Sequence, residues 1–218
     1  MGYYNHSRGK LEKAKRLYEK ALEKGADIPN YKLSYGVLLL KKGDFEKARE
    51  LFSNVLISAP QKGNIKTIAK INLSIAYWKL GQVDTAIEML EEVYAKFRNG
   101  RLYETMGYIL LEKGDLNRAL EFNLEALDYD DENPIILDNL GQTYYRLGQK
   151  EKAKEYFEKA EKLRNNQVDI LYHLGCVYME EGKKELAKEK LQKALECDIS
   201  PLNSVSRSEI EAKLRELE

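Results

Sequence analysis

Histidine and cysteine are the residue types in this chain best suited to hold a metal ion or to act as a nucleophile, and both are rare. His6 and His173 are the only histidines, and neither belongs to a motif with zinc-ligand spacing. Cys176 and Cys197 are too few for a four-thiolate site. We expect them on different helices, as buried free thiols.

An acidic run at residues 128–133 is the other feature that suggests chemistry, because clustered carboxylates can bind calcium. It lacks the glycine and the terminal glutamate of a calcium-binding loop, so a solvated loop is the better interpretation. No phosphate-binding glycine loop or nucleophile motif occurs. The sequence predicts no catalytic residue, no metal and no cofactor.

The composition narrows the class of protein further. The 218 residues include 36 Lys and Arg and 36 Asp and Glu, so the formal net charge is zero. Non-specific nucleic-acid binding requires a basic surplus, so we expect no nucleic-acid partner. The longest apolar run, residues 37–40, is far shorter than the ~20 residues of a membrane span.

The function class that remains is binding. An internal repeat in the sequence predicts the helices that would form a binding surface. A glycine-centred phrase such as KGDFEKA recurs six times, with spacings of 34, 38, 33, 34 and 34 residues between the glycines Gly9, Gly43, Gly81, Gly114, Gly148 and Gly182. Apolar residues on both sides of each glycine follow helical spacing. A glycine between two such segments predicts a helix C-terminus with a left-handed residue. Asp44 and Asp115 are predicted to cap the helices that follow.

Three further columns keep a constant distance from these glycines. Seven residues before them stand Gly2, Gly36, Ser74, Gly107, Gly141 and Gly175, and five residues after them stands an alanine each time. The third column, seven residues beyond the alanine, is small or β-branched. Glycine inside a helix costs ~1 kcal/mol against alanine, so its recurrence indicates close helix packing. Each repeat is therefore predicted to be a tight antiparallel helix pair.

This pattern resembles the tetratricopeptide repeat family, whose signature columns are matched best in residues 134–167 by Leu137, Leu140, Gly141, Tyr144, Ala153, Phe157 and Ala160. Lys32, Lys70, Ser74 and Asn123 depart from those columns. The resemblance implies an all-α fold, a right-handed α-α superhelix (solenoid) of antiparallel helix pairs. The glycine and alanine columns and the zero net charge fit the RNA-binding pentatricopeptide repeat poorly.

The predicted repeat array covers residues 1–201. It consists of a partial unit at 1–28 and full units at 29–66, 67–99, 100–133, 134–167 and 168–201. The 38-residue spacing predicts an inserted loop or helical turn at residues 61–66. Residues 202–218 are predicted to form a C-terminal capping helix, with Ser206 or Ser208 as its N-cap.

In the family that this chain resembles, the first helix of each pair lines a concave groove that holds a peptide. Column alignment and helix geometry then predict the groove residues. They are Leu33, Val37, Leu40, Ile68, Ile71, Asn72, Ile75, Trp78, Arg101, Tyr108, Asp138, Gln142, Tyr145 and Tyr172. Apolar residues dominate the first half of this set, with Trp78 and Tyr108 as aromatic anchors. Of the family's clamp for a C-terminal carboxylate, only Asn72 and Arg101 fit, which argues against that mode.

The resulting hypothesis is a non-catalytic scaffold that binds a protein or peptide of unknown identity in a partly apolar groove. Two alternatives stay open: a self-associating structural assembly subunit, and the regulatory repeat domain of a larger membrane-anchored protein. The half-unit at residues 1–28 favours a homodimer through this end or disorder in residues 1–7. We expect a cytoplasmic location, or a soluble domain whose N-terminal membrane anchor precedes this chain.

Overall fold

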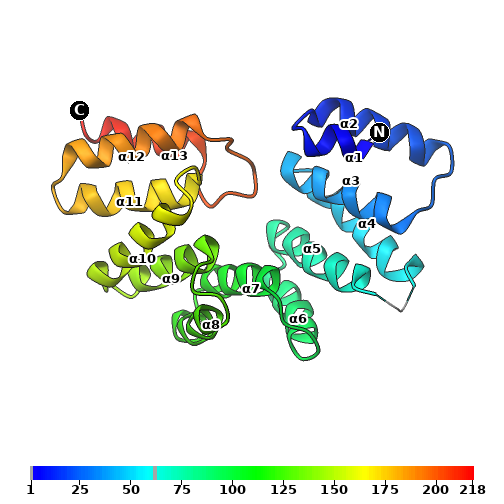
Figure 1. Ribbon diagram of the computed structural model, residues 1–218, viewed down its shortest axis with the longest axis horizontal. Coiled ribbons are helices and arrows are strands. Elements are labelled where there is room, and N and C mark those ends of the chain that lie inside the picture. Colours follow the sequence, from blue (N-terminus) through cyan, green and yellow to red (C-terminus); the bar gives the residue numbers. More distant parts are fainter. Residues whose placement is uncertain (1, 61–62) are drawn as a thin grey trace. The chain divides into compact units, whose positions relative to one another are not determined.

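The computed structural model describes residues 2–60 and 63–218, which contain thirteen α-helices and no strand (Figure 1). The helices are α1 (Gly2–Ser7), α2 (Leu11–Glu23), α3 (Pro29–Lys42), α4 (Phe45–Ser58), α5 (Ile65–Lys79), α6 (Val83–Tyr94), α7 (Gly100–Lys113), α8 (Leu116–Tyr129), α9 (Pro134–Arg146), α10 (Lys150–Leu163), α11 (Val168–Glu180), α12 (Lys184–Glu196) and α13 (Arg207–Arg215). The all-α prediction is confirmed.

The chain divides into two compact units, Met1–Phe97 and Arg98–Glu218. In the first unit α1 packs on α2, α3 on α4 and α5 on α6, and α4 also contacts α5. In the second unit the pairs are α7 with α8, α9 with α10 and α11 with α12, followed by α13. An insertion was predicted at residues 61–66. Its first two residues, Gln61 and Lys62, lie outside the described residues.

The recurring glycine ends the first helix of each pair, as predicted. All six have positive φ, for example +77° at Gly148. Asp44 and Asp115 cap the helices that follow, since each carboxylate accepts a hydrogen bond from the backbone N–H three residues on, that of Lys47 (3.4 Å) and that of Arg118 (3.2 Å). In these two repeats a Gly–Asp pair therefore ends one helix and caps the next.

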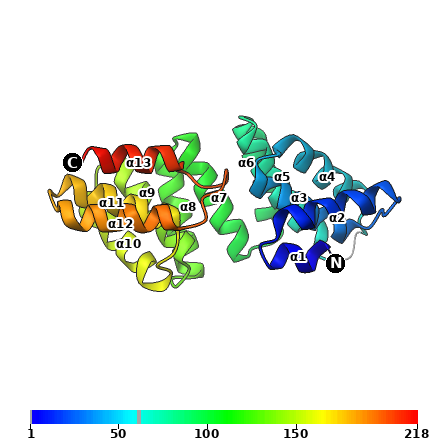
Figure 2. The same ribbon diagram turned by 90° about the horizontal axis from the view of Figure 1, so that it is seen from above.

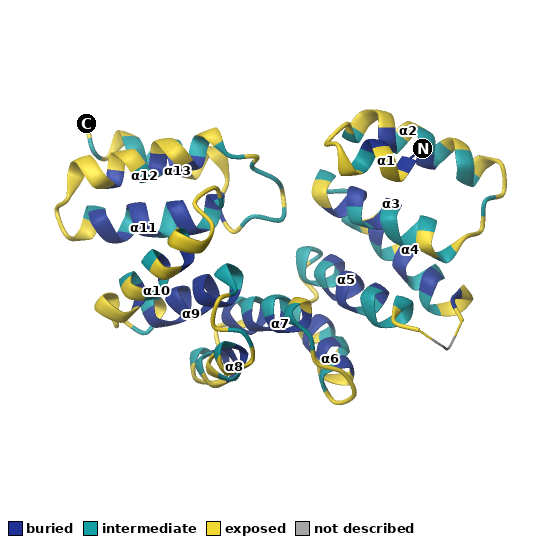
Figure 3. Ribbon diagram, in the orientation of Figure 1, coloured by how far each residue is buried: buried dark blue, intermediate teal, exposed yellow. Residues whose placement is uncertain are grey.

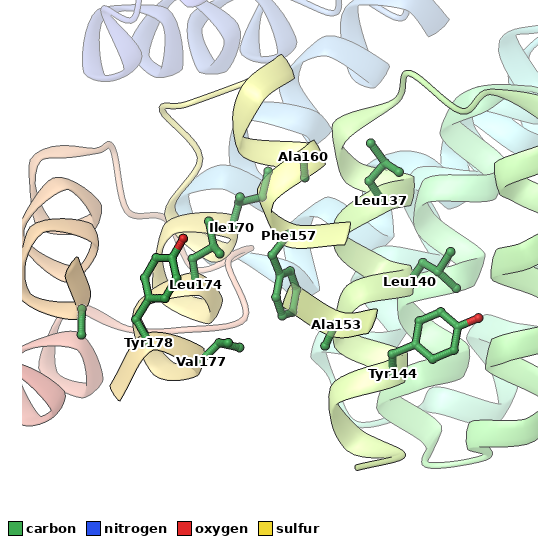
Figure 4. Close-up of a cluster of buried hydrophobic side chains, with 11 residues drawn as sticks. Leu137, Leu140, Tyr144, Ala153, Phe157, Ala160, Ile170, Leu174, Val177 and Tyr178 are labelled. Carbon is green, nitrogen blue, oxygen red and sulfur yellow. The ribbon is translucent and has the colours of Figure 1, made fainter. Parts of the chain in front are cut away.

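The in-helix glycine column lets the two helices of a pair approach closely. A Cβ on Gly141 of α9 would lie 2.6 Å from the ring of Phe157 on α10. Phe157 fills the centre of a buried cluster with Leu140 on one side and Leu174 of α11 on the other (Figure 4). One aromatic side chain therefore joins a helix pair to the pair that follows it.

Asn123 of α8 occupies the same column as Phe157 and makes this layer polar. It is fully buried, and its Nδ2 donates to Thr143 Oγ1 at 3.2 Å. Asn123 Oδ1 is buried and has no partner among the described residues. The departure from the family column therefore leaves an unsatisfied acceptor in the core.

The C-terminal helix α13 covers the last pair (Figure 2). Ser206 is its N-cap, and Ser206 and Glu209 form a capping box. Ile210 is fully buried in a cluster with Leu171 and Leu191. Helix α13, from Arg207 to Arg215, lies within the segment 202–218 for which a capping helix was predicted.

At the other end, Gly2–Ser7 form α1 rather than a disordered segment, while Met1 lies outside the described residues. Gly2 lies against the fully buried ring of Tyr18. Buried residues follow the inward stripes of the helices in both units, and the outer faces of α2 and α12 are largely exposed (Figure 3).

Candidate partner-binding site

The second unit contains a cavity of about 510 Å³ at α9, α11 and α13. Its walls come from these three helices and comprise Gln142, Tyr145, Arg146, Tyr172, His173, Cys176, Met179, Glu180, Lys213 and Glu216. Three predicted groove residues, Gln142, Tyr145 and Tyr172, meet here. Cys176 and Met179 share the groove-facing side of their helix with Tyr172.

The charged groups at this cavity have partners of their own. Lys213 pairs with Glu216 at 2.9 Å. Glu180 accepts from Lys150 Nζ at 2.7 Å and from the hydroxyl of Tyr145.

Arg146, the remaining charged residue of the wall, is also held by its neighbours. It donates to the backbone oxygen of Leu111 at 3.0 Å and pairs with Glu112. The two cations and two anions of the wall therefore cancel, and Tyr172, Cys176 and Met179 are among its uncharged residues.

Asp138 lies beside this cavity with only 4% of its surface exposed. Its Oδ2 accepts from Gln142 Nε2 at 2.8 Å, and its Oδ1 lies 3.2 Å from His173 Nδ1. Burial raises the pKa of the Asp138 carboxyl, and the nearby His173 opposes that shift. The carboxylate thus holds the His173 ring in place from the preceding helix pair.

His173 is held on two further sides. Its ring stacks on Phe157 with 5.2 Å between centroids and meets the edge of Tyr172 at 5.6 Å. No role was predicted for His173, because it belongs to no motif with zinc-ligand spacing. Its partner Asp138 is 35 residues away in sequence. This separation in sequence is one 34-residue repeat plus one residue, and it is the only feature of the sequence that indicates the pair.

The cysteines differ from the prediction, since both are partly exposed rather than buried. Cys176 is one helical turn from His173 and lines the cavity. Burial raises the pKa of the Cys176 thiol, so it is protonated at neutral pH and is a poor nucleophile. Among residues 2–60 and 63–218, no three His, Cys, Asp or Glu side chains are placed to hold a metal ion.

In the first unit the predicted groove residues divide into two groups. Half-buried side chains are Leu33, Val37, Ile68, Ile75 and Trp78. Leu40, Ile71 and Asn72 are buried to 1% exposure or less and offer no surface to a partner, which corrects the prediction. The reason is that α5 packs against α3, α4 and α6. Contacts with three helices bury more of its circumference than the single packing face that helix geometry predicts.

Asn72 and Arg101, the two residues that fit the carboxylate clamp, belong to different units. Asn72 Nδ2 donates to the backbone oxygen of Ile68 at 2.8 Å inside the first unit. Arg101 is exposed at the start of α7 in the second unit. Tyr108, further along α7, is half-buried, and burial raises its pKa. Neither Arg101 nor Tyr108 lines the cavity at α9, α11 and α13.

The helix pairs and their side-chain columns define a helical repeat protein of the α-solenoid class. Models described as tetratricopeptide repeat match residues 7–62, 39–106, 100–133, 136–167 and 168–198. The chain belongs to the tetratricopeptide repeat family, a class of protein-interaction scaffolds that are generally non-catalytic.

Relatives and solved structures agree with this assignment. The chain is 36% identical over 77 residues to BBSome complex member BBS4 of Bos taurus, covering 35% of this chain and 15% of that protein. It is 26% identical over 156 residues to DnaJ homolog subfamily C member 3 of Gallus gallus, covering 66% and 31%. The chain thus spans a third or less of the length of the curated relatives it matches.

Among solved structures, a tetratricopeptide repeat protein from Parabacteroides merdae has a TM-score of 0.82 at 16% identity, covering 99% of this chain and 81% of that one. A thermophilic repeat protein of Thermus thermophilus has a TM-score of 0.71 at 23% identity, covering 87% and 98%. These likenesses concern the fold. No helix in residues 2–60 or 63–218 has the length and apolar character needed to cross a bilayer.

Proposed function

We propose that this protein is an interaction scaffold that binds a peptide segment of a partner protein, with the cavity at α9, α11 and α13 as its main docking site. The observation that carries the proposal is the convergence of Gln142, Tyr145 and Tyr172, predicted as groove residues, on one cavity of about 510 Å³. Concave, mostly apolar sites with a few polar groups are where ligands dock.

The character of the walls favours an uncharged side chain with a large apolar surface as the anchor of that segment. The wall charges are already paired, so a charged anchor would have to displace Lys213 from Glu216 or Lys150 from Glu180. An apolar anchor would replace water over Tyr172 and Met179 without breaking an ion pair.

A displayed peptide library selected on the whole chain tests the proposal. Peptides recovered from it should bind Tyr172→Ala more weakly by about 2 kcal/mol, because truncation removes an aromatic contact at the centre of the site. Leu186→Ala is the matched control, since Leu186 is an exposed apolar residue of α12 outside the cavity. Peptides whose affinity is equal for the wild type and Tyr172→Ala would place the docking site elsewhere.

Self-association is the second candidate function, and exposed residues on α1 and at the start of α3 favour it. Tyr3, Tyr4 and Ile28 are each more than half exposed, and Tyr3 and Ile28 border a separate cavity of about 430 Å³ that also contacts Tyr31 and Leu33. Isologous pairing through this end would cover these side chains. Sedimentation velocity over a range of concentrations should then show a dimer that Tyr3→Ser with Ile28→Ser abolishes; a monomer at all concentrations rejects this candidate.

A further inference from the structure

One nitrogen at the cavity has hydrogen-bonding capacity that the protein does not use. His173 Nδ1 faces Asp138, and the ring is fixed by Phe157 and Tyr172, but His173 Nε2 makes no hydrogen bond within the described part of the chain. The buried side-chain nitrogens and oxygens without a partner there are Tyr18 Oη and Asn123 Oδ1. His173 Nε2 is therefore open to solvent, in a residue that lines the cavity.

We propose that the anchor residue of the partner segment is a tyrosine, whose ring fills the cavity and whose hydroxyl hydrogen-bonds to His173 Nε2. The inference rests on the proposed function and adds the chemistry of the occupant. It makes His173 the polar recognition group of the site, and Asp138 the residue that positions it.

The walls explain why the occupant is aromatic and neutral. Tyr145, Tyr172 and Met179 supply two aromatic rings and a thioether, which are favourable neighbours for another aromatic ring. A lysine or glutamate anchor would add a charge to a wall whose charges already cancel. A leucine or phenylalanine anchor would cover His173 Nε2 and leave it without a partner.

A phenol also suits both states of the Asp138–His173 pair. When the pair holds one proton, His173 Nδ1–H donates to the Asp138 carboxylate and Nε2 is an acceptor. When it holds two, Nε2–H is a donor. A tyrosine hydroxyl donates and accepts, so it can pair with Nε2 in either state, whereas an indole N–H can only donate.

Two capped amino acids that differ by a single hydroxyl test the inference. N-acetyl-tyrosine amide and N-acetyl-phenylalanine amide are titrated into the full chain, and the imidazole signals are followed by NMR. The chain has two histidines, so His6 on α1 in the other unit serves as an internal reference. The tyrosine probe should bind about threefold to tenfold more tightly, as expected for one hydrogen bond, and shift the His173 signals but not those of His6.

The double variant Asp138→Asn, His173→Phe is the matched control. It keeps a ring stacked on Phe157 and leaves no unpaired buried carboxylate. It should bind both probes equally, with the affinity that the phenylalanine probe has for the wild type. If this variant does not fold, the tyrosine inference is still tested by the wild type, through the affinities of the two probes and the shifts of the His173 signals.

The outcomes separate the two proposals. Equal affinity of the wild type for both probes, with His173 shifted, overturns the tyrosine inference and leaves the cavity as a docking site. A tyrosine preference that persists in the double variant overturns the role of His173. If neither probe binds and no His173 signal shifts, the cavity is not the docking site, and both proposals fail.

Discussion

The Cα of Gly141 lies so close to the ring of Phe157 that a Cβ on Gly141 would be 2.6 Å from Phe157 Cδ1. Gly36 and Phe52 stand in the same relationship in the first unit, at 2.5 Å. Real Cβ atoms do not approach a neighbour this closely, so α9 and α10 are in contact at the limit that glycine permits. A side chain at either glycine would have to push a buried ring aside.

Gly141→Ala should lower the free energy of unfolding by about 1–3 kcal/mol, because the added methyl forces the helices apart or the Phe157 ring off its rotamer. Urea denaturation followed by circular dichroism measures the change. Gly100→Ala is the control, since a Cβ there would lie 3.7 Å from its nearest neighbour, Asn133 Nδ2. If both variants are equally stable, close packing is not what the glycine column provides.

Gly148→Ala isolates the cost of backbone strain. Gly148 has φ +77° and no atom within 4 Å of an added Cβ, so a loss of stability there comes from the left-handed conformation alone. We expect Gly148→Ala to lose about 1 kcal/mol, and Gly148→Asn to lose less, because asparagine tolerates this conformation better. Thermal and urea denaturation of both variants checks the order. If Gly148→Asn loses as much stability as Gly148→Ala, the predicted order is wrong.

Asn123→Leu should stabilise the second unit by about 1 kcal/mol, because it removes a buried acceptor that has no partner. Leu191 shows that this column accepts leucine opposite a glycine, here Gly175. Asn117→Leu, on the exposed side of the same helix, is the matched control. A destabilised Asn123→Leu would mean that the hydrogen bond to Thr143 outweighs the unsatisfied oxygen.

Asp138→Asn should change how stability depends on pH. Because burial raises the pKa of Asp138 in the folded state, its favourable contribution is present below about pH 4 and is lost as the pH rises through the folded-state pKa. The asparagine side chain does not titrate, so the free energy of unfolding of this variant relative to wild type should rise as the pH increases above about 4. Denaturation at a series of pH values measures the difference, with the exposed Asp198→Asn as the reference. If the free energy of unfolding of the variant relative to wild type falls with pH instead, ion pairing with His173 has a larger effect on the pKa of Asp138 than burial.

Local features of the structure could be predicted because they depend on residues that are close in sequence. The positive φ at Gly148, the cap at Asp115 and the capping box at Ser206 each involve neighbours within a few positions. The close packing of Gly141 could also be predicted, because glycine is costly inside a helix and its recurrence there indicates a position without room for a side chain.

The candidate site was predictable only in part. Helix geometry predicted Tyr145 and Tyr172 as groove residues, and both line the cavity. It also assigned Ile71 and Asn72 to an open groove, but the surrounding helices bury them. Burial depends on how many helices surround an element, and one sequence does not contain that information.

The amino-acid sequence by itself determined the fold, because the repeat period and its turn glycine are local features that recur six times. Only the tertiary structure decided which groups meet. His173 and Asp138 join from adjacent helix pairs at 3.2 Å, and Lys213 of the capping helix reaches the same cavity. Such meetings are set by the packing of one repeat on the next, to within an ångström, and residue types and spacings do not specify distances on that scale.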